Sequence, residues 1–365
     1  MKICFLAGAN SIHSVRWIKY FSDKGHKIIW ISLAPPIPEA ADLIKKVSFY
    51  EIKPSPLNDI NGHWAIFYLP SAIRQFKKIL KTAKPDLLHV HSVGTYGLIS
   101  FFGCFHPIIL TPWGSDILLF PKNILRKKIL KFILKKADAF TIDGLNARKV
   151  LEDFGAPKEK IFFIQFGVDI KKFFPEKKPS ANAVISLRNL EPIYDIATLI
   201  KAVPIIMSKI PNTEFLVAGD GSEKQKLIEL SGKLGVSNYV KFIGKITHDD
   251  LPEIFNESIL YVSTSLSDSG LSMSTAEAMA SGLPVVVSDS SDNKEWIKNN
   301  ENGFVVPIKN SEALAEKIIF LLKNPDLAKQ MGKNNQKLIE EKNNYCLEME
   351  KAEKLYRKMI SKKLI

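Results

Sequence analysis

Short apolar runs rich in β-branched residues recur along this chain, with amphipathic helical patterns between them. In the first half these runs are KICFLAG, HKIIWIS, DLLHVHS, PIILTPW, AFTIDG and IFFIQFG, and a helix is predicted from about Ile12. Strands that alternate with helices form parallel sheets that helices cover on both faces. The pattern therefore places the chain in the α/β class.

The alternation stops near Asp169 and resumes about fifteen residues later. The stretch DIKKFFPEKKPSAN has two prolines, several lysines and no apolar periodicity, which is typical of an interdomain linker. AVISLR, EFLVAGDG, YVKFIG, ILYVSTS and PVVVSD then continue the pattern. A chain of 365 residues can bury two cores. We therefore expect Rossmann-like domains over residues 1–172 and 173–345, and a C-terminal helix over residues 346–365 that packs back on the first domain.

Several classes of protein are disfavoured by the composition. The cysteines, Cys4, Cys104 and Cys346, lack the spacing of a disulfide framework or a zinc site. Polar residues follow MKICFLAGAN where a signal peptide would stay apolar. The longest apolar region, residues 97–113, is interrupted by prolines and is too short to span a bilayer. A cytoplasmic location is expected.

The segment SDSGLSMSTAEAMASGLPVVVSD, residues 267–289, predicts a strand, a loop, a short helix and a second strand. The loop carries Gly270, and the helix ends at Gly282. The amide groups of residues 271–274 would then lie at the carboxyl edge of the sheet, where they suit a phosphate. In the first helical turn Glu277 is placed to accept the hydroxyls of a ribose. The alternative is that Ser274 and Glu277 form a capping box.

A net charge of +13 favours anionic partners. The segment from Lys122 to Lys136, KNILRKKILKFILKK, is rich in basic residues and contains no acidic residue. Leu125, Ile129, Phe132 and Ile133 are predicted on one helical face, opposite Lys127, Lys128, Lys131 and Lys135. SAIRQFKKILK has a similar pattern. We expect these helices to dock on an anionic membrane surface, and the alternative is a core helix with a solvated charged face. Nucleic acid is not expected, because no aromatic residues interleave with the charge.

EAMASGLPVVVSD resembles the signature segment of the retaining glycosyltransferases of family 4. SDKGHKI, KPDLLHVHSVGTYG, FGVDIKKFFP, LVAGDGSEKQKL, VKFIGKI and ENGFVVP resemble other segments of that family in the same order. The resemblance implies the GT-B architecture, in which two Rossmann-like domains face each other across a cleft. It implies retaining, metal-independent transfer of a hexose-type sugar from a nucleotide-diphosphate sugar, with no cofactor beyond this co-substrate. The acceptor would be a glycan or a lipid-linked molecule in polysaccharide or glycolipid biosynthesis.

The resemblance also assigns roles to individual residues. Arg188 would meet the diphosphate, Glu277 the ribose, and His91 the donor sugar or acceptor oxygen. Ser269 and Tyr194 stand where the family usually has an acid and a lysine, with Asp268 beside Ser269. The expected catalytic residues are His91, Asp116 and Arg188. The expected donor-binding residues are Gly8, Arg188, Tyr194, Gly244, Ser269, Gly270, Leu271, Ser272, Met273 and Glu277.

Alternatives remain for several of these residues and for the function. Arg188 is otherwise an exposed arginine, His91 a satisfied core histidine, and Asp116 the cap of a turn. A metal pair at His89 and His91 is disfavoured because the sequence offers no third ligand nearby. A sugar-nucleotide epimerase or hydrolase of the same fold is one functional alternative. A binding-only homologue of the transferases is the other.

Overall fold

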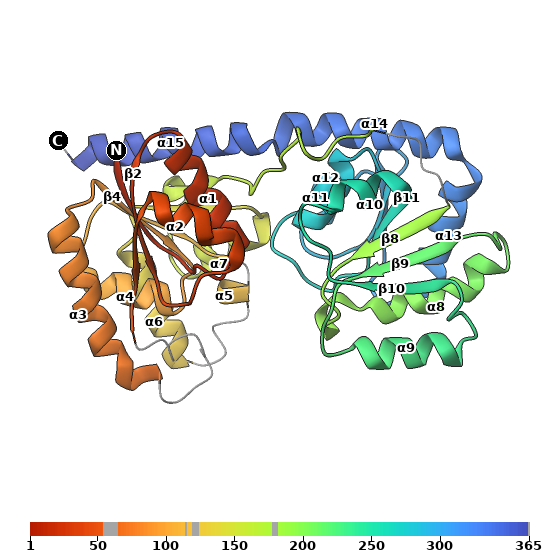
Figure 1. The fold of residues 1–365 in the computed structure, drawn as a ribbon, viewed down its shortest axis with the longest axis horizontal. Coiled ribbons are helices and arrows are strands. Elements are labelled where there is room, and N and C mark those ends of the chain that lie inside the picture. Colours follow the sequence, from red (N-terminus) through yellow and green to blue (C-terminus); the bar gives the residue numbers. More distant parts are fainter. Residues whose placement is uncertain (54–64, 114, 119–123, 177–181, 364–365) are drawn as a thin grey trace. The chain divides into compact units, whose positions relative to one another are not determined.

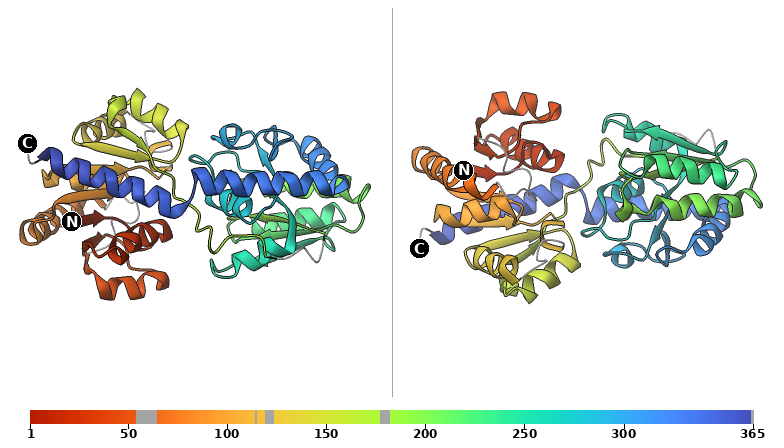
Figure 2. Two further views of the ribbon diagram at one scale, coloured as in Figure 1. Left: turned by 90° about the horizontal axis from the view of Figure 1, so that it is seen from above. Right: turned by 90° about the horizontal axis from the view of Figure 1, so that it is seen from below.

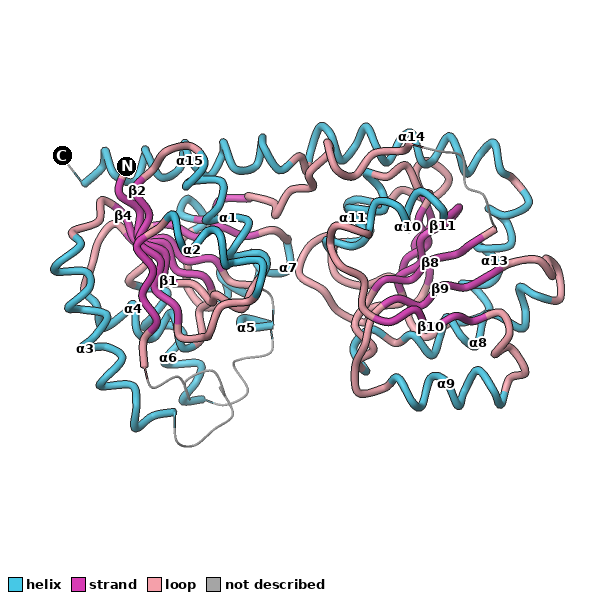
Figure 3. Tube along the Cα trace, viewed as in Figure 1, coloured by secondary structure: helices cyan, strands magenta, loops and turns pink. Residues whose placement is uncertain are grey.

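The computed structural model describes residues 1–53, 65–113, 115–118, 124–176 and 182–363. The chain divides into two compact units. Unit 1 contains Met1–Gln165 and Glu348–Ile365, and unit 2 contains Phe166–Leu347. The limits predicted at residues 172 and 345 lie a few residues from these. Each unit has a sheet with helices on both faces (Figure 1 and Figure 3). In the described part of the chain, no helix has the length and apolar character needed to cross a bilayer.

The sheet of unit 1 is parallel, with strand order β3-β2-β1-β4-β5-β6-β7. Its strands are β1 (Lys2–Leu6), β2 (Lys27–Ser32), β3 (Ser48–Glu51), β4 (Leu87–His91), β5 (Ile108–Thr111), β6 (Ala139–Ile142) and β7 (Ile161–Phe163). All except β3 fall within the apolar runs of the sequence. The edge strand β3 is short and half exposed, so SFYE has no continuous apolar run to indicate it.

Helices cover both faces of this sheet. They are α1 (Ile12–Asp23), α2 (Ala41–Lys46), α3 (Ala65–Ala83), α4 (Thr95–Gly103), α5 (Ser115–Leu118), α6 (Ile124–Lys135), α7 (Leu145–Asp153) and α15 (Tyr345–Lys363), with short 3₁₀ turns η1 (Pro38–Ala40) and η3 (Lys158–Lys160). Residues of α3, α4 and α6 form one core with the sheet. On the other face, Phe5 of β1 contacts Phe21 of α1 and Tyr356 of α15.

Helix α15 belongs mostly to unit 1, although it comes last in the sequence, and Figure 2 shows it running along that unit. The indole Nε1 of Trp17 donates a hydrogen bond of 2.9 Å to the hydroxyl of Tyr356. Nε2 of His26 lies 3.2 Å from a carboxylate oxygen of Glu353. These contacts attach the C-terminal helix to α1 and to the loop between α1 and β2.

The buried face of the basic helix α6 differs from its prediction, which included Phe132 and left out Leu130 and Leu134. Its buried face consists of Leu130, Ile133 and Leu134, with Ile129 half buried. Phe132 is not on this face, because its side chain is 58% exposed among the lysines. The spacing explains this: residues 130, 133 and 134 share a helical face, and residue 132 projects well away from it. Lys122 and Asn123 lie outside the described residues, as do the side chains of Leu125 and Arg126.

Unit 2 has a parallel sheet with strand order β10-β9-β8-β11-β12-β13. Its strands are β8 (Ala183–Leu187), β9 (Glu214–Ala218), β10 (Val240–Gly244), β11 (Ser258–Ser263), β12 (Val285–Ser288) and β13 (Gly303–Val306). Its helices are α8 (Ile196–Met207), α9 (Lys224–Lys233), α10 (Leu251–Glu257), α11 (Met273–Ala280), α12 (Asn293–Trp296), α13 (Ser311–Lys323) and α14 (Pro325–Lys342), with the 3₁₀ turn η4 (Pro192–Tyr194). Helices α8 and α13 pack on one face, and α10, α11 and α14 on the other. The prediction of two parallel α/β units is confirmed.

Helix α11 is held against α14 by direct backbone contact. Gly282, just after α11, has φ of +79°, which favours glycine. A Cβ on Gly332 of α14 would lie 1.9 Å from the carbonyl oxygen of Gly282. No side chain fits between these two backbones, so the pair of glycines determines how closely α14 approaches the end of α11.

Candidate functional site

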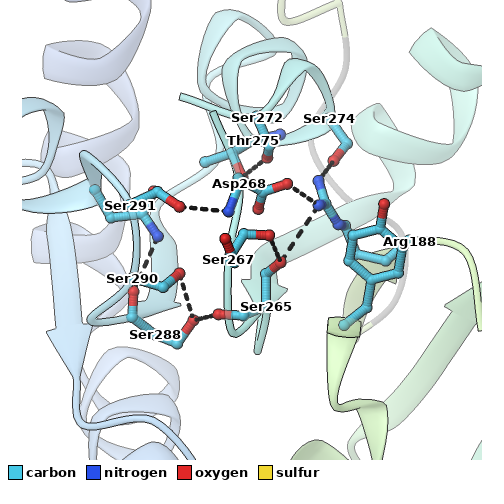
Figure 4. A network of polar contacts seen from close by, with 12 residues as sticks. Arg188, Ser265, Ser267, Asp268, Ser272, Ser274, Thr275, Ser288, Ser290 and Ser291 are labelled. Atoms are coloured by element: carbon cyan, nitrogen blue, oxygen red, sulfur yellow. Dashed lines mark hydrogen bonds and ion pairs between the residues drawn. The ribbon is translucent and has the colours of Figure 1, made fainter. Parts of the chain in front are cut away.

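Two segments of unit 2 meet at the carboxyl edge of its sheet. Strand β8 ends at Leu187, so Arg188 leaves the sheet there, and residues 264–272 connect β11 to α11. Strands β8 and β11 are neighbours, and the carboxyl ends of parallel strands lie at the same edge. Figure 4 shows the result, in which the side chain of Arg188 points into a group of hydroxyls and one carboxylate. The hydroxyl-bearing residues are Ser265, Ser267, Ser272, Ser274, Thr275, Ser288, Ser290 and Ser291.

Arg188 is buried rather than exposed, since its side chain is 9% accessible. Its guanidinium is ion-paired with Asp268 and lies 3.4 Å from the hydroxyls of both Ser265 and Ser274. The ring of Tyr194 lies 4.2 Å from the guanidinium carbon. Nε of Arg188 is buried and has no hydrogen-bond partner among the described residues. The alternative of an exposed surface arginine is therefore wrong.

The positive charge of Arg188 is maintained despite burial. Burial alone lowers the pKa of the guanidinium, but the carboxylate of Asp268 and the phenols of Tyr261 and Tyr194 raise it. The net effect is a pKa above the usual arginine value. A charged planar guanidinium with an unused N–H donor can engage two oxygens of a phosphate group.

Helix α11 begins earlier than the spacing of Ser274 and Glu277 predicts. Its N-cap is Ser272, whose extended backbone lets the hydroxyl accept the amide hydrogen of Thr275 at 3.4 Å. Glu277 is therefore in the second turn, and the predicted first-turn position and capping box with Ser274 are wrong. The carboxylate is free of that cap and is 4% exposed. Its Oε1 lies 3.1 Å from Nε2 of His248.

The other expected donor-binding residues of unit 2 occupy loops and strand ends. Gly270 and Gly244 have φ of +61° and +75°. The side chain of Leu271 belongs to the core, so only its backbone is available to a ligand. Ser269 precedes Gly270 in the same loop, and Met273 is the first residue of α11. Asp268 points to Arg188, and this conformation does not place its carboxylate in the position of Ser269.

A second group of polar and aromatic residues surrounds the end of β4 in unit 1. His89 and His91 project on the same face, because both rings contact Trp17 edge-on. Nε2 of His89 lies 2.5 Å from the hydroxyl of Thr111, and Nδ1 is hydrogen-bonded to Tyr356. His89 is thus a satisfied core histidine.

His91 is different, because only one of its ring nitrogens is used. Nδ1 lies 3.0 Å from the hydroxyl of Ser14. Nε2 is buried without a hydrogen-bond partner among the described residues. Burial, and to a smaller extent the charge of His13, lowers the pKa of His91 to about 3. The ring is therefore neutral at neutral pH, and one nitrogen is available for a hydrogen bond.

Asp116 uses both carboxylate oxygens to hold two loops together. One oxygen accepts the amide hydrogen of Val93 and the other that of Trp113, both at 2.8 Å. Burial raises the pKa of Asp116, and these hydrogen bonds oppose the increase. Trp113 in turn contacts the His91 ring, with centroids 4.9 Å apart. The geometry therefore gives Asp116 the role of a turn cap near His91. At Gly8 a Cβ would lie 2.7 Å from Oδ1 of Asn10, so this position is already crowded by the protein itself.

Sequence reasoning missed two residues of the unit 2 site. His248 is a lone histidine before two acids in THDD, which carries no recognisable signal. Tyr261 lies inside an apolar strand, yet its hydroxyl is 2.9 Å from that of Ser274. Among the described residues, no three His, Cys, Asp or Glu side chains gather closely enough to hold a metal ion.

Comparison with known proteins shows which family models and which relatives match this chain. Residues 168–338 match the family model described as glycosyl transferases group 1, and residues 2–143 match that described as glycosyl transferase 4-like. The phosphatidyl-myo-inositol mannosyltransferase of Mycolicibacterium smegmatis is 23% identical, over 88% of this chain and 82% of that protein. The putative glycosyltransferase EpsD of Bacillus subtilis is 32% identical, over 38% of this chain and 36% of that protein.

Solved structures with this fold cover nearly the whole chain. Sucrose-phosphate synthase from Thermosynechococcus elongatus superposes with a TM-score of 0.86 and 19% identity, over 99% of both chains. HepE of Anabaena, solved in complex with UDP-glucose, superposes with a TM-score of 0.81 and 18% identity, over 97% of this chain and 99% of that one. At such identities the likeness shows the GT-B fold.

Proposed function

The chain belongs to the group 1 glycosyltransferases of the GT-B fold, and we propose that it transfers a hexose-type sugar from a nucleotide-diphosphate sugar with retention and without a metal ion. The acceptor is a glycan or a lipid-linked molecule, as in polysaccharide or glycolipid biosynthesis. Two similar proteins support this assignment, since one is named a phosphatidyl-myo-inositol mannosyltransferase and the other, HepE, was solved in complex with UDP-glucose.

The observation that carries the proposal is the buried positive charge of Arg188. Negative charge develops on the leaving diphosphate, and a preorganised guanidinium stabilises it without reorganising water. The unused Nε donor of Arg188 and the start of α11 lie at the same sheet edge. Tyr194 does not supply the missing cation. Instead, its aromatic ring packs against the guanidinium and restricts the orientation of that group.

Glu277 takes the ribose in this proposal. His248 contacts only Oε1 of the buried carboxylate, which leaves Oε2 for the hydroxyls of a pentose. On the acceptor side, Nε2 of His91 hydrogen-bonds a hydroxyl of the acceptor or of the donor sugar. Asp116 acts as a positioning residue, because it holds the loops on which Trp113 and the end of β4 depend.

Retention follows if the acceptor hydroxyl attacks the face from which the diphosphate leaves. The bond from the anomeric carbon to the diphosphate oxygen breaks, and that oxygen takes the proton of the acceptor hydroxyl as the new glycosidic bond forms. Positioning and charge stabilisation carry such a step, so no nucleophile from the protein is required.

A thermal-shift screen with UDP, GDP and their sugars tests the donor site, since a ligand of the folded state raises the unfolding temperature. Glu277→Gln should abolish the shift, while Glu340→Gln, on the exposed side of α14, should leave it unchanged. Product analysis with the donor that binds then separates the alternatives. Free sugar or an epimer that forms without an acceptor would favour the epimerase or hydrolase. Donor binding without turnover on any acceptor would favour the binding-only homologue.

The location proposed is the cytoplasmic side of a membrane, at its inner face. The exposed side of α6 carries Lys128, Lys131 and Lys135 together with Ile124 and Phe132, which are 75% and 58% exposed. Basic and apolar side chains on one helical face suit an anionic bilayer surface, where a lipid-linked acceptor would be found.

A further inference from the structure

The buried carboxylate of Glu277 is held by a residue from a different loop. His248 follows β10, and its Nε2 lies 3.1 Å from Oε1 of Glu277. The side chain of Glu277 is 4% exposed and that of His248 is 35% exposed. A carboxylate so far removed from water needs a hydrogen-bond donor to remain charged. Among the described residues, this imidazole is the side chain that contacts the Glu277 carboxylate.

The other side of the imidazole decides which nitrogen carries the proton. Nζ of Lys172 lies 2.9 Å from Nδ1 of His248 and 2.6 Å from a carboxylate oxygen of Asp249. A lysine ammonium donates hydrogen bonds and accepts none, so Nδ1 must be the acceptor. The proton of the neutral ring is then on Nε2, which donates to Glu277.

The orientation of the His248 ring is also held by packing. Phe173, next to Lys172, contacts the His248 ring edge-on, with centroids 5.3 Å apart. Lys172 and Phe173 come from the segment that joins the sheet of unit 2 to the preceding part of the chain, whereas Glu277 is on α11. Asp249, Lys172, His248 and Glu277 thus form a continuous polar chain across three segments of unit 2.

From this chain of contacts we infer that His248, with its tautomer set by Lys172, positions Glu277 and makes nucleotide binding selective for ribose over 2′-deoxyribose. The inference rests on the proposed function, in which Glu277 accepts the pentose hydroxyls. Because Oε1 is committed to His248, the carboxylate cannot rotate freely. Oε2 therefore has one orientation, which discriminates between a pentose with and without a 2′-hydroxyl.

Three variants test the chain. His248→Phe keeps a ring of similar size but removes both hydrogen bonds. His248→Gln keeps a donor and an acceptor on one side chain, because its amide nitrogen donates to Glu277 and its oxygen accepts from Lys172. Lys172→Met removes the donor that sets the tautomer. His106→Phe, at a half-exposed histidine of unit 1, is the control.

Calorimetry with UDP or GDP, whichever binds the wild type, and with its 2′-deoxy analogue gives the dissociation constants. We expect His248→Phe to weaken binding of the ribonucleotide about tenfold, as for loss of a hydrogen bond to a charged group, and to leave the deoxy analogue nearly unaffected. The preference for ribose should therefore fall by the same factor. Lys172→Met should have a smaller effect in the same direction. His248→Gln should retain most of the preference, and His106→Phe all of it.

The outcomes separate the inference from the proposed function. A wild type that binds neither UDP nor GDP would overturn both. A wild type that prefers ribose, with His248→Phe keeping that preference, would overturn the inference alone. Equal weakening of both nucleotides in His248→Phe would also overturn it, because a purely structural role of the ring would lower both affinities and leave their ratio unchanged.

Discussion

The carboxylate of Asp268 is paired with the guanidinium of Arg188 at the carboxyl edge of the unit 2 sheet, and both side chains are largely buried. Asp268 is also fixed through its backbone, whose amide donates to the hydroxyl of Ser291. The pair neutralises the one cation that the proposed function assigns to the diphosphate. A diphosphate that binds Arg188 must therefore compete with a carboxylate of the protein itself.

Replacing Asp268 by Asn should affect stability and binding in opposite directions. The variant leaves a buried guanidinium without its counter-ion, so we expect the free energy of unfolding to fall by about 1–3 kcal/mol. Affinity for a nucleoside diphosphate should rise severalfold, because the competing charge is gone. Urea unfolding and calorimetry measure the two effects. Lower affinity together with lower stability would mean that Asp268 helps to bind the ligand.

Much of the fold could be predicted because the pattern of apolar residues within each short segment indicates which of its faces are buried. KICFLAG and PVVVSD are apolar on both faces, as expected for strands covered by helices on both sides, and they became β1 and β12. The strand SFYE was missed, because an edge strand at the rim of the sheet needs no such run. Phe132 was misplaced, since a one-residue difference in helical phase moves a side chain from the core to the surface.

The candidate site was less predictable, because it depends on which of several adjacent hydroxyls forms a cap and on contacts distant in sequence. Ser272 and Ser274 are both reasonable N-caps, and the choice between them moves Glu277 from the first turn to the second. Between His248 and Glu277 the chain passes through α10, β11 and the start of α11, and no spacing rule indicates that the two residues pair. The role of Asp116 in holding two loops likewise appears only when β4 and β5 are side by side.

The two buried histidines of β4 should make folding sensitive to mild acid. Burial lowers the pKa of both His89 and His91, the latter to about 3, whereas an unfolded histidine titrates near 6.5. As the pH falls below about 6.5, these histidines become protonated in the unfolded state but stay neutral in the folded state. Stability present above that pH is then lost by about 1.4 kcal/mol per pH unit for each histidine, down to the folded pKa.

The measurement is urea unfolding of the whole chain between pH 7.5 and 5, followed by tryptophan fluorescence, to which Trp17, Trp30 and Trp113 of unit 1 contribute. Below about pH 6.5, His91→Gln should reduce the pH dependence of the unfolding free energy by about 1.4 kcal/mol per unit, because one of the two groups no longer titrates. If the variant and the wild type show the same slope, His91 takes up its proton in the folded protein and is not held neutral.

The contact of Gly332 with Gly282 predicts a strong asymmetry between two helical glycines. An alanine at position 332 would place its Cβ against the backbone of Gly282 and force α14 away from α11, at a cost of about 3 kcal/mol. Gly232 near the end of α9 has no atom closer than 3.8 Å to such a Cβ, so alanine there should stabilise the protein by about 0.5–1 kcal/mol. Urea unfolding of the two variants measures both changes. Equal effects at the two positions would contradict the packing argument.

The exposed face of α6 predicts binding to anionic vesicles. Ile124, Lys128, Lys131, Phe132 and Lys135 are exposed at helical spacings that bring them to one side. Each lysine near an anionic surface contributes about 1 kcal/mol, so changing Lys128, Lys131 and Lys135 together to Gln should lower partitioning onto phosphatidylserine-containing vesicles about 100-fold. Phe132→Ser should lower it about tenfold, through loss of buried apolar surface. Sedimentation at low salt measures both.

The matched control removes the same charge from unit 2. Lys329, Lys333 and Lys337 are exposed at four-residue spacing on α14, and their change to Gln alters the net charge equally. If membrane binding depended only on net charge, this control and the α6 variant would lose affinity alike. We expect the control to bind as the wild type does, because without exposed aromatic side chains among its lysines the α14 face has only the screened surface attraction. Equal binding of the wild type to neutral and anionic vesicles would rule out docking through α6.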